Sequence, residues 1–199
     1  MHVYEQIGAV LLLVGASPVL AVSAGVVSLL SGRSPFVAHL RVGQHGRPLW
    51  MLKLRTMWPP ESSSPHERGL VERIVAEPDQ DRKDPADSRV RSRFASFCRK
   101  HSIDELPQLL HVVRGEMSLV GPRPLTRSEV KRHYGPLAPR LLSVKPGMTG
   151  LWQVLGRGTI GWRERTRLDL KMVEQSSRKY YCAIIVRTVS AVARGNGAW

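Results

Sequence analysis

A run of 24 uncharged residues, Ile7 to Leu30, constrains this chain more than any other feature. A helix needs about 20 apolar residues to cross the hydrocarbon core of a bilayer, so this run is long enough to span one. A secretory signal peptide would carry basic residues before a shorter apolar core, and residues 1–6 contain none. We therefore expect residues 1–32 to form a membrane element.

Ser17 and Pro18 interrupt the apolar run near its middle. Proline bends or breaks a helix, and a serine hydroxyl can satisfy the backbone groups that the bend frees. The residues alone leave two arrangements equally open: a kinked helix that spans the bilayer, or two half-length helices that enter and leave one leaflet. In either case the Lys/Arg excess after residue 32 places residues 33–199 on the cytoplasmic side.

The remainder of the chain is strongly basic. Its 30 Lys and Arg against 16 Asp and Glu give a formal net charge of +14. Eight of the acids but only four of the bases lie between Glu61 and Asp87, which leaves 26 bases against 8 acids elsewhere. This excess favours anionic partners such as lipid head groups or phosphate-bearing substrates. No recognised nucleic-acid motif accompanies it, so we expect no nucleic-acid partner.

Sequence patterns predict an α+β fold for residues 33–199, mainly helical with one short β-hairpin. Residues 35–57 form the predicted hairpin, with its turn at Gly43 and Gly46 to Pro48. Residues 58–88 are rich in Pro, Ser and acids, which indicates a loop-rich insert with room for a short helix around Gly69–Ala76.

Apolar residues at helical spacing predict helices in three further segments. These segments are 89–115, expected in two pieces, 162–175 and 178–194. Between charged residues the last helix is too short to span a bilayer, and we expect it to lie at the membrane interface. Residues 118–150 contain many prolines and glycines and predict a loop-rich region.

Asp104 and Glu105 are adjacent at a predicted helix start, because Pro107 is tolerated only in a first turn. Ser102 and Glu105 also have the spacing of a capping box. The stretch from Arg89 to His101 holds several bases and no acid. Helix N-termini and arginines both favour an ionised carboxylate, which can act as a nucleophile or a metal ligand. By spacing alone, the ordinary interpretation is that both acids merely complement the helix dipole.

Three basic residues outside that stretch are candidate phosphate contacts. Lys53 and Arg55 alternate with leucines, which would put both on one face of a strand. Arg123 lies between two prolines, so a stiff turn would present its guanidinium, a group suited to bidentate phosphate binding. For each of them the alternative is an ordinary solvated surface charge.

Four sequence blocks resemble the bacterial sugar transferases, also called monotopic phosphoglycosyl transferases. Residues 99–125 read RKHSIDELPQLLHVVRGEMSLVGPRPL, similar to the family's RKxSLDELPQLxNVLxGxMSLVGPRPL. Residues 41–57, 145–157 (KPGMTGLWQVLGR) and 168–199 resemble three more family blocks. The departures from the family pattern are His39, Leu54, Arg91, Ala95 and His111, which replace the common Gln, Phe, Thr, Gly and Asn.

The resemblance implies a chemistry for the site. Asp104 would be the nucleophile on the phosphate next to the sugar of a UDP-sugar, releasing UMP and forming a phosphosugar–Asp intermediate. A polyprenyl (undecaprenyl) phosphate would then attack that intermediate. Glu105, with Asp104, would help to bind Mg²⁺ or assist proton transfer. Arg99 and Arg123 match basic positions near the phosphates, and Lys53 and Arg55 match by motif.

The resemblance also implies a setting. Ser17 and Pro18 would break a re-entrant helix in the inner leaflet of the bacterial cytoplasmic membrane, with both chain ends cytoplasmic. The enzyme would begin exopolysaccharide, capsule, O-antigen or glycoprotein glycan synthesis, with downstream glycosyltransferases or a second copy of the chain as further partners. The alternatives are a membrane-tethered basic scaffold and a nucleic-acid-binding protein, and the intact Asp104–Glu105 pair argues against the scaffold.

Overall fold

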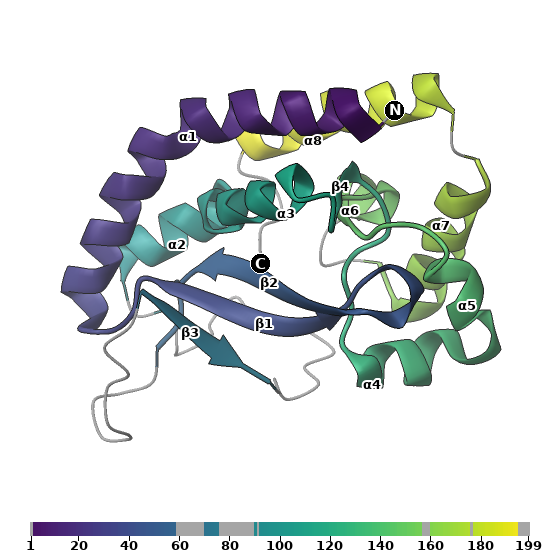
Figure 1. Ribbon diagram of the computed structural model, residues 1–199, viewed down its shortest axis with the longest axis horizontal. Helices are drawn as coiled ribbons and strands as arrows, with labels where there is room; N and C mark the ends of the chain where they lie inside the picture. The colour runs from purple at the N-terminus through teal and green to yellow at the C-terminus, as the bar shows by residue number, and fades with distance from the viewer. Residues whose placement is uncertain are drawn as a thin grey trace.

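The computed structural model describes residues 2–58, 70–75, 90, 92–156, 160–175 and 177–194. Figure 1 shows an α+β arrangement in which helices α2 (Arg93–Lys100) and α3 (Leu109–Val113) lie between a small sheet and the long N-terminal helix α1 (His2–Ser31). The predicted α+β class with an apolar N-terminal helix is confirmed.

Helix α1 is the one described helix that is long and apolar enough to cross a membrane, with a mean hydropathy of 2.3 over its most apolar part. It bends in its middle (Figure 1), and Pro18 lies inside it. The Ser17 hydroxyl donates a hydrogen bond to the Val14 carbonyl, 2.7 Å away. The break expected from the sequence is therefore a bend within one continuous helix.

Both halves of α1 pack on the rest of the chain through a narrow face. Ala9 is fully buried in a cluster that includes Leu109 of α3, and Val27 is fully buried with Leu54 and Cys98. Most of the remaining apolar side chains of α1 are exposed. The helix is thus part of the fold's core and also its largest outward apolar surface.

The predicted hairpin is confirmed. Strands β1 (Phe36–Val42) and β2 (Pro48–Leu54) pair antiparallel, with a 3-10 turn, η1 (Gln44–Gly46), between them. A third strand, β3 (Val71–Ile74), pairs parallel with β1 and gives the order β2-β1-β3.

The short helix for which the loop-rich insert left room around Gly69–Ala76 does not form in the described residues 70–75, which contain β3 instead. Val71, Ile74 and Val75 are β-branched, and the open edge of β1 offers them backbone partners. The other residues of the acidic insert, 59–69 and 76–88, lie outside the described part of the chain.

The helices expected in 162–175 and 178–194 are confirmed as α7 (Trp162–Glu174) and α8 (Arg178–Arg194). The segment 89–115 holds α2, a 3-10 helix η2 (Ile103–Gln108) and α3. The loop-rich expectation for 118–150 is only partly right. That segment and its continuation hold β4 (Ser118–Val120), α4 (Arg127–Glu129), η3 (Val130–Tyr134), η4 (Gly135–Leu137), α5 (Ala138–Leu141), β5 (Gly147–Thr149) and α6 (Leu151–Gly156).

A close backbone contact joins β4 to β5, which pair in parallel. Gly121 N–H donates to the Thr149 carbonyl at 2.9 Å, and Gly147 N–H donates to the Pro122 carbonyl at 2.8 Å. A Cβ on Gly147 would overlap the backbone of Gly121, so the approach requires glycine. The turn that carries Arg123 is therefore fixed against β5.

Candidate active site

Asp104 and Glu105 lie in the first turn of η2, which begins at Ile103, within the predicted helix start. The predicted capping box is wrong. Ser102 has a left-handed backbone (φ 54°), and its side chain makes no capping hydrogen bond. The Glu105 N–H donates to the Ser102 carbonyl instead, at 3.1 Å. A non-glycine residue in this region is uncommon and carries strain, which often occurs beside functional residues.

Asp104 is 8% exposed. It lies close enough to Cys98 that its charge, together with burial as the larger cause, raises the pKa of that thiol to about 11. The Cys98 thiol also forms a hydrogen bond with Ser23 of α1, which is itself buried. Cys98 thus packs against the C-terminal half of the apolar helix and lies near the candidate nucleophile.

Glu105 forms an ion pair with Lys53 at the end of β2. The Lys53 Nζ lies 3.3 Å from the Glu105 Oε1, and the two side chains are 15% and 20% exposed. Mostly buried ion pairs are screened little, and removing one partner is costly. The structure therefore brings Lys53 next to Glu105, a contact that the sequence analysis did not predict.

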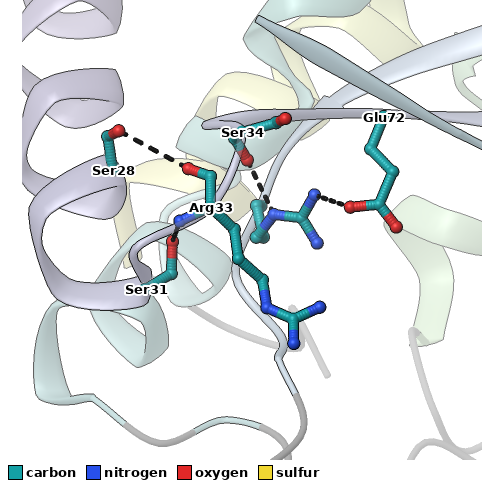
Figure 2. Close-up of polar contacts among 6 residues, drawn as sticks. Ser28, Ser31, Arg33, Ser34 and Glu72 are labelled. Atoms are coloured by element: carbon teal, nitrogen blue, oxygen red, sulfur yellow. Dashed lines mark hydrogen bonds and ion pairs between the residues drawn. The ribbon is translucent and has the colours of Figure 1, made fainter. Parts of the chain in front are cut away.

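Arg55 lies just past the end of β2, and its N–H continues the strand pairing by donating to the Pro35 carbonyl at 2.7 Å. It keeps the alternation with Lys53 that the sequence predicted, but its guanidinium has different partners. Its Nε donates to the Ser34 carbonyl at 2.7 Å, and its Nη2 lies 2.5 Å from Glu72 Oε2 of β3 (Figure 2). Arg55 is 4% exposed and ties β3 to the segment that follows α1.

Figure 2 also shows how the end of α1 is fixed. The Arg33 N–H donates to the Ser31 hydroxyl at 3.2 Å, and the Ser28 hydroxyl lies 3.4 Å from the Arg33 carbonyl. These serine contacts satisfy the backbone N–H and carbonyl of Arg33, directly after the helix.

Arg99 is in the last turn of α2, and only 9% of it is exposed. Its Nε makes no hydrogen bond within the part of the chain that the structure describes. A buried guanidinium N–H without a protein partner is unfavourable unless a ligand oxygen accepts from it. Arg99 is therefore the candidate phosphate contact on the Asp104 side.

Arg123 follows β4 and belongs to a second cluster, which also contains side chains of η3, α6 and α7. Its guanidinium lies 5.9 Å from the Trp152 ring centre, and that of Arg165 lies 4.6 Å from the same ring. Arg165 also lies 5.1 Å from the Trp162 ring. Guanidinium–indole stacking is favourable, and here it brings two like charges to the same ring. The charge of Arg123 and burial, the larger cause, both lower the pKa of Arg165.

Asp169 is the acid of this second cluster. It is 1% exposed and accepts a hydrogen bond of 2.6 Å from the Tyr134 hydroxyl. Burial raises the pKa of Asp169 to about 7, against the opposing effects of the Tyr134 hydrogen bond and of Arg123 and Arg165. Burial and the Asp169 charge raise the pKa of Tyr134 in turn.

The sequence analysis did not single out Trp152, Arg165, Asp169 or Glu5. Trp152 and Asp169 lie in the family-like blocks 145–157 and 168–199. A match to such a block does not show which residues a side chain contacts. His111 stands where the family commonly has Asn. Its Nε2 accepts from the Leu52 N–H at 3.1 Å, and its Nδ1 lies 2.5 Å from Glu116 Oε2. His111 thus holds α3 against β2, one residue from Lys53. Arg91 lies outside the described residues.

The carboxylates of Asp104 and Glu105 are of the type that binds a divalent cation. Mg²⁺ is commonly held by one or two carboxylates together with substrate phosphates and water. Asp104 and Glu105 supply two, and no group of three or more His, Cys, Asp or Glu side chains placed to hold a metal occurs among the described residues. These residues fit a site that the phosphates of a substrate would complete.

Comparisons with known proteins identify similar sequences along almost the whole chain. A family model described as bacterial sugar transferase matches residues 2–195. The exopolysaccharide production protein ExoY of Sinorhizobium fredii is 36% identical over 202 residues, covering 98% of this chain and 86% of that protein.

Two further relatives carry more specific names. The UDP-galactose-lipid carrier transferase of Erwinia amylovora is 38% identical over 98% of this chain, which spans only 41% of that protein. The UDP-glucose:undecaprenyl-phosphate glucose-1-phosphate transferase of Caulobacter vibrioides is 34% identical over 100% of this chain and 71% of that protein.

Proposed function

The chain belongs to the bacterial sugar transferase family, and we propose that it moves a sugar 1-phosphate from a UDP-sugar to polyprenyl phosphate. We place this reaction at the cytoplasmic face of the inner membrane. The named relatives support a nucleotide-sugar donor and an undecaprenyl phosphate acceptor. The product would begin an exopolysaccharide, capsule, O-antigen or glycoprotein glycan.

The observation that carries this proposal is the surroundings of Asp104. It is a buried carboxylate in a 3-10 turn, next to the Glu105–Lys53 pair and linked to α1 through Cys98. A carboxylate held in place can attack phosphorus and form a covalent intermediate. An Asp104 oxygen would bond to the phosphorus that carries the sugar, while the bond from that phosphorus to the bridging oxygen breaks and UMP leaves.

The second step regenerates the enzyme. An oxygen of polyprenyl phosphate would attack the same phosphorus, and the bond to Asp104 would break to leave a polyprenyl diphosphate sugar. The acceptor's chain is a long hydrocarbon, so its phosphate must meet the site at a lipid surface. The exposed apolar side chains of α1, whose buried face carries Ser23 beside Cys98, support such a surface at the site.

The neighbouring charges would offset the charge of the donor diphosphate. Phosphoryl transfer depends mainly on positioning and on electrostatic stabilisation. The buried Arg99 supplies an N–H for a phosphate oxygen, and Arg123, held on Trp152, supplies a second guanidinium. Mg²⁺, held by Asp104 and Glu105, would supply additional stabilisation of the phosphate charge.

UMP release tests the proposal. The purified protein in detergent, with Mg²⁺, undecaprenyl phosphate and a panel of UDP-sugars, should release UMP with at least one donor. Asp104→Asn should abolish release, and Glu105→Gln should slow it about a hundred- to ten-thousandfold, as for a lost acid–base helper.

Glu174→Gln is the matched control. Glu174 forms a surface ion pair with Arg140 at the far end of α7, so its loss should leave UMP release unchanged. Release that is absent with every donor, or equal in Asp104→Asn and wild type, would refute the transferase assignment.

A further inference from the structure

Glu5 is the only Asp, Glu, Lys or Arg among the first 32 residues, and its surroundings are unusual. One of its oxygens, Oε1, accepts hydrogen bonds from the Ser118 hydroxyl at 2.5 Å, the Leu119 N–H at 3.0 Å and the Tyr181 hydroxyl at 2.6 Å. The donors come from β4 and α8, more than a hundred residues away. Three donors on one carboxylate oxygen form a strong, charge-assisted contact.

Neighbouring contacts hold the same turn of α1. The Gln6 Nε2 donates to the Val113 carbonyl at 3.1 Å, and Ala9 is fully buried against α3. In Figure 1, α8 runs beside the N-terminal half of α1, as the Tyr181 bond requires. The first turn of the apolar helix is therefore bonded to the catalytic domain.

This attachment bears on how the helix meets the bilayer. The segment from Glu5 to Ser17 is about 20 Å long at 1.5 Å per residue, shorter than the ~30 Å hydrocarbon core. A helix that crossed the bilayer would carry Glu5 to the opposite side and break all three hydrogen bonds. A carboxylate near lipid is also unfavourable unless donors satisfy it.

We propose that Glu5 is a positioning residue whose three hydrogen bonds hold the N-terminal half of α1 against β4 and α8, so that the helix enters and leaves the same face of the membrane. This inference rests on the proposed membrane-bound function, which it deepens. It assigns the topology to a specific carboxylate as well as to the bend at Ser17 and Pro18. It also fixes where α1 lies relative to the site that receives the lipid phosphate.

The test uses the full chain in bacterial cells with an epitope tag at the N-terminus. In the wild type the tag should resist protease added to spheroplasts. Glu5→Leu should raise the protease-sensitive fraction at least tenfold, since each hydrogen bond to a charged group contributes about tenfold or more. The same variant should raise the KM for polyprenyl phosphate more than the KM for the donor.

Milder variants keep the test valid if Glu5→Leu fails to fold. Tyr181→Phe and Ser118→Ala should each give a smaller shift, and Tyr181→Phe should add nothing in the Glu5→Leu background, as expected for coupled groups. Tyr4→Phe is the matched control, because Tyr4 is 81% exposed on the same turn.

An unchanged tag location in Tyr181→Phe, Ser118→Ala and every folded Glu5 variant would overturn the inference. The location of the tag does not depend on enzyme activity. If the wild type releases no UMP, the proposed function fails, while the tag still decides whether Glu5 sets the topology.

Discussion

At the scale of single residues, Asp104 and Glu105 are neighbours in sequence with different surroundings. Asp104 is buried beside the Cys98 thiol, whereas Glu105 is paired with Lys53 of β2. The pairing ties the η2 turn to the end of the sheet. We therefore expect Lys53 to act on the proposed site through Glu105, in addition to any contact that it makes with phosphates.

Replacing Lys53 tests that coupling. Lys53→Met leaves a mostly buried carboxylate without its cation, and we expect UMP release to fall about ten- to hundredfold. Lys53→Arg should recover part of the activity, because the charge is kept. In the double variant Lys53→Met/Glu105→Gln the two losses should not multiply, and fully multiplicative losses in steady-state kinetics would show that the two residues act independently.

The raised pKa of Asp169 predicts that the stability of the folded protein depends on pH. Burial raises its pKa from 3.8 to about 7 in the folded protein, so the folded state binds this proton more tightly than the unfolded state. The stability that the protonated acid contributes is complete below pH 3.8 and is lost as pH rises toward 7, at up to about 1.4 kcal/mol per pH unit.

Asp169→Asn removes this titration while keeping an oxygen that can accept from Tyr134. Melting temperatures of the variant and the wild type, measured in detergent from pH 4 to 8, should diverge as pH rises, with the variant gaining relative to wild type. A constant difference across that range would contradict the raised pKa of Asp169.

Local patterns predicted elements that lie within one segment, but they did not predict contacts between distant segments. The hairpin that carries Lys53 and the start of η2 both follow from residues within one segment. The contact between Arg55 and Glu72 was not predicted, because the residues around Glu72 were expected to be mainly loop and form strand β3 instead. Likewise, no spacing indicates that Arg165 and Arg123 meet on Trp152.

Among the helices and strands, those defined by residues within one segment were predicted. Those that depend on pairing between distant segments were not. Helices α7 and α8 and the β1–β2 hairpin follow from periodicity and turn residues within one segment. Strands β4 and β5 have three residues each and pair across more than 20 residues. Strands this short have no recognisable alternation, so their glycines and prolines suggested loop.

The Gly121–Gly147 contact gives a prediction about β4 and β5. Gly147→Ala would push a methyl group into the Gly121 backbone, and we expect a loss of about 3 kcal/mol or more together with weaker donor binding, since the Arg123 turn moves. Gly161→Ala is the control, because no atom lies within 4 Å of its added Cβ. Equal melting temperatures for the two variants would mean that β5 can move away without cost.

At the scale of the whole molecule, α1 is both core and membrane element. Its buried face joins two core clusters, and its outward face carries exposed apolar residues along its length. The sequence predicted the apolar helix and its break, but not that both halves pack on the catalytic domain. That packing joins Asp104 and the exposed apolar face of α1 in one fold, as the proposed reaction between a soluble nucleotide sugar and a membrane-bound phosphate would require.

In the proposed reaction, Asp104 carries the sugar phosphate between donor and acceptor. Intact-protein mass spectrometry of the purified enzyme, incubated with its UDP-sugar and Mg²⁺ but without polyprenyl phosphate, tests it most directly. We predict one added sugar phosphate per chain, mapped to Asp104, absent from Asp104→Asn and lost when the acceptor is added. UMP release that requires the acceptor, with no added mass at any time, would contradict the claim and indicate direct transfer.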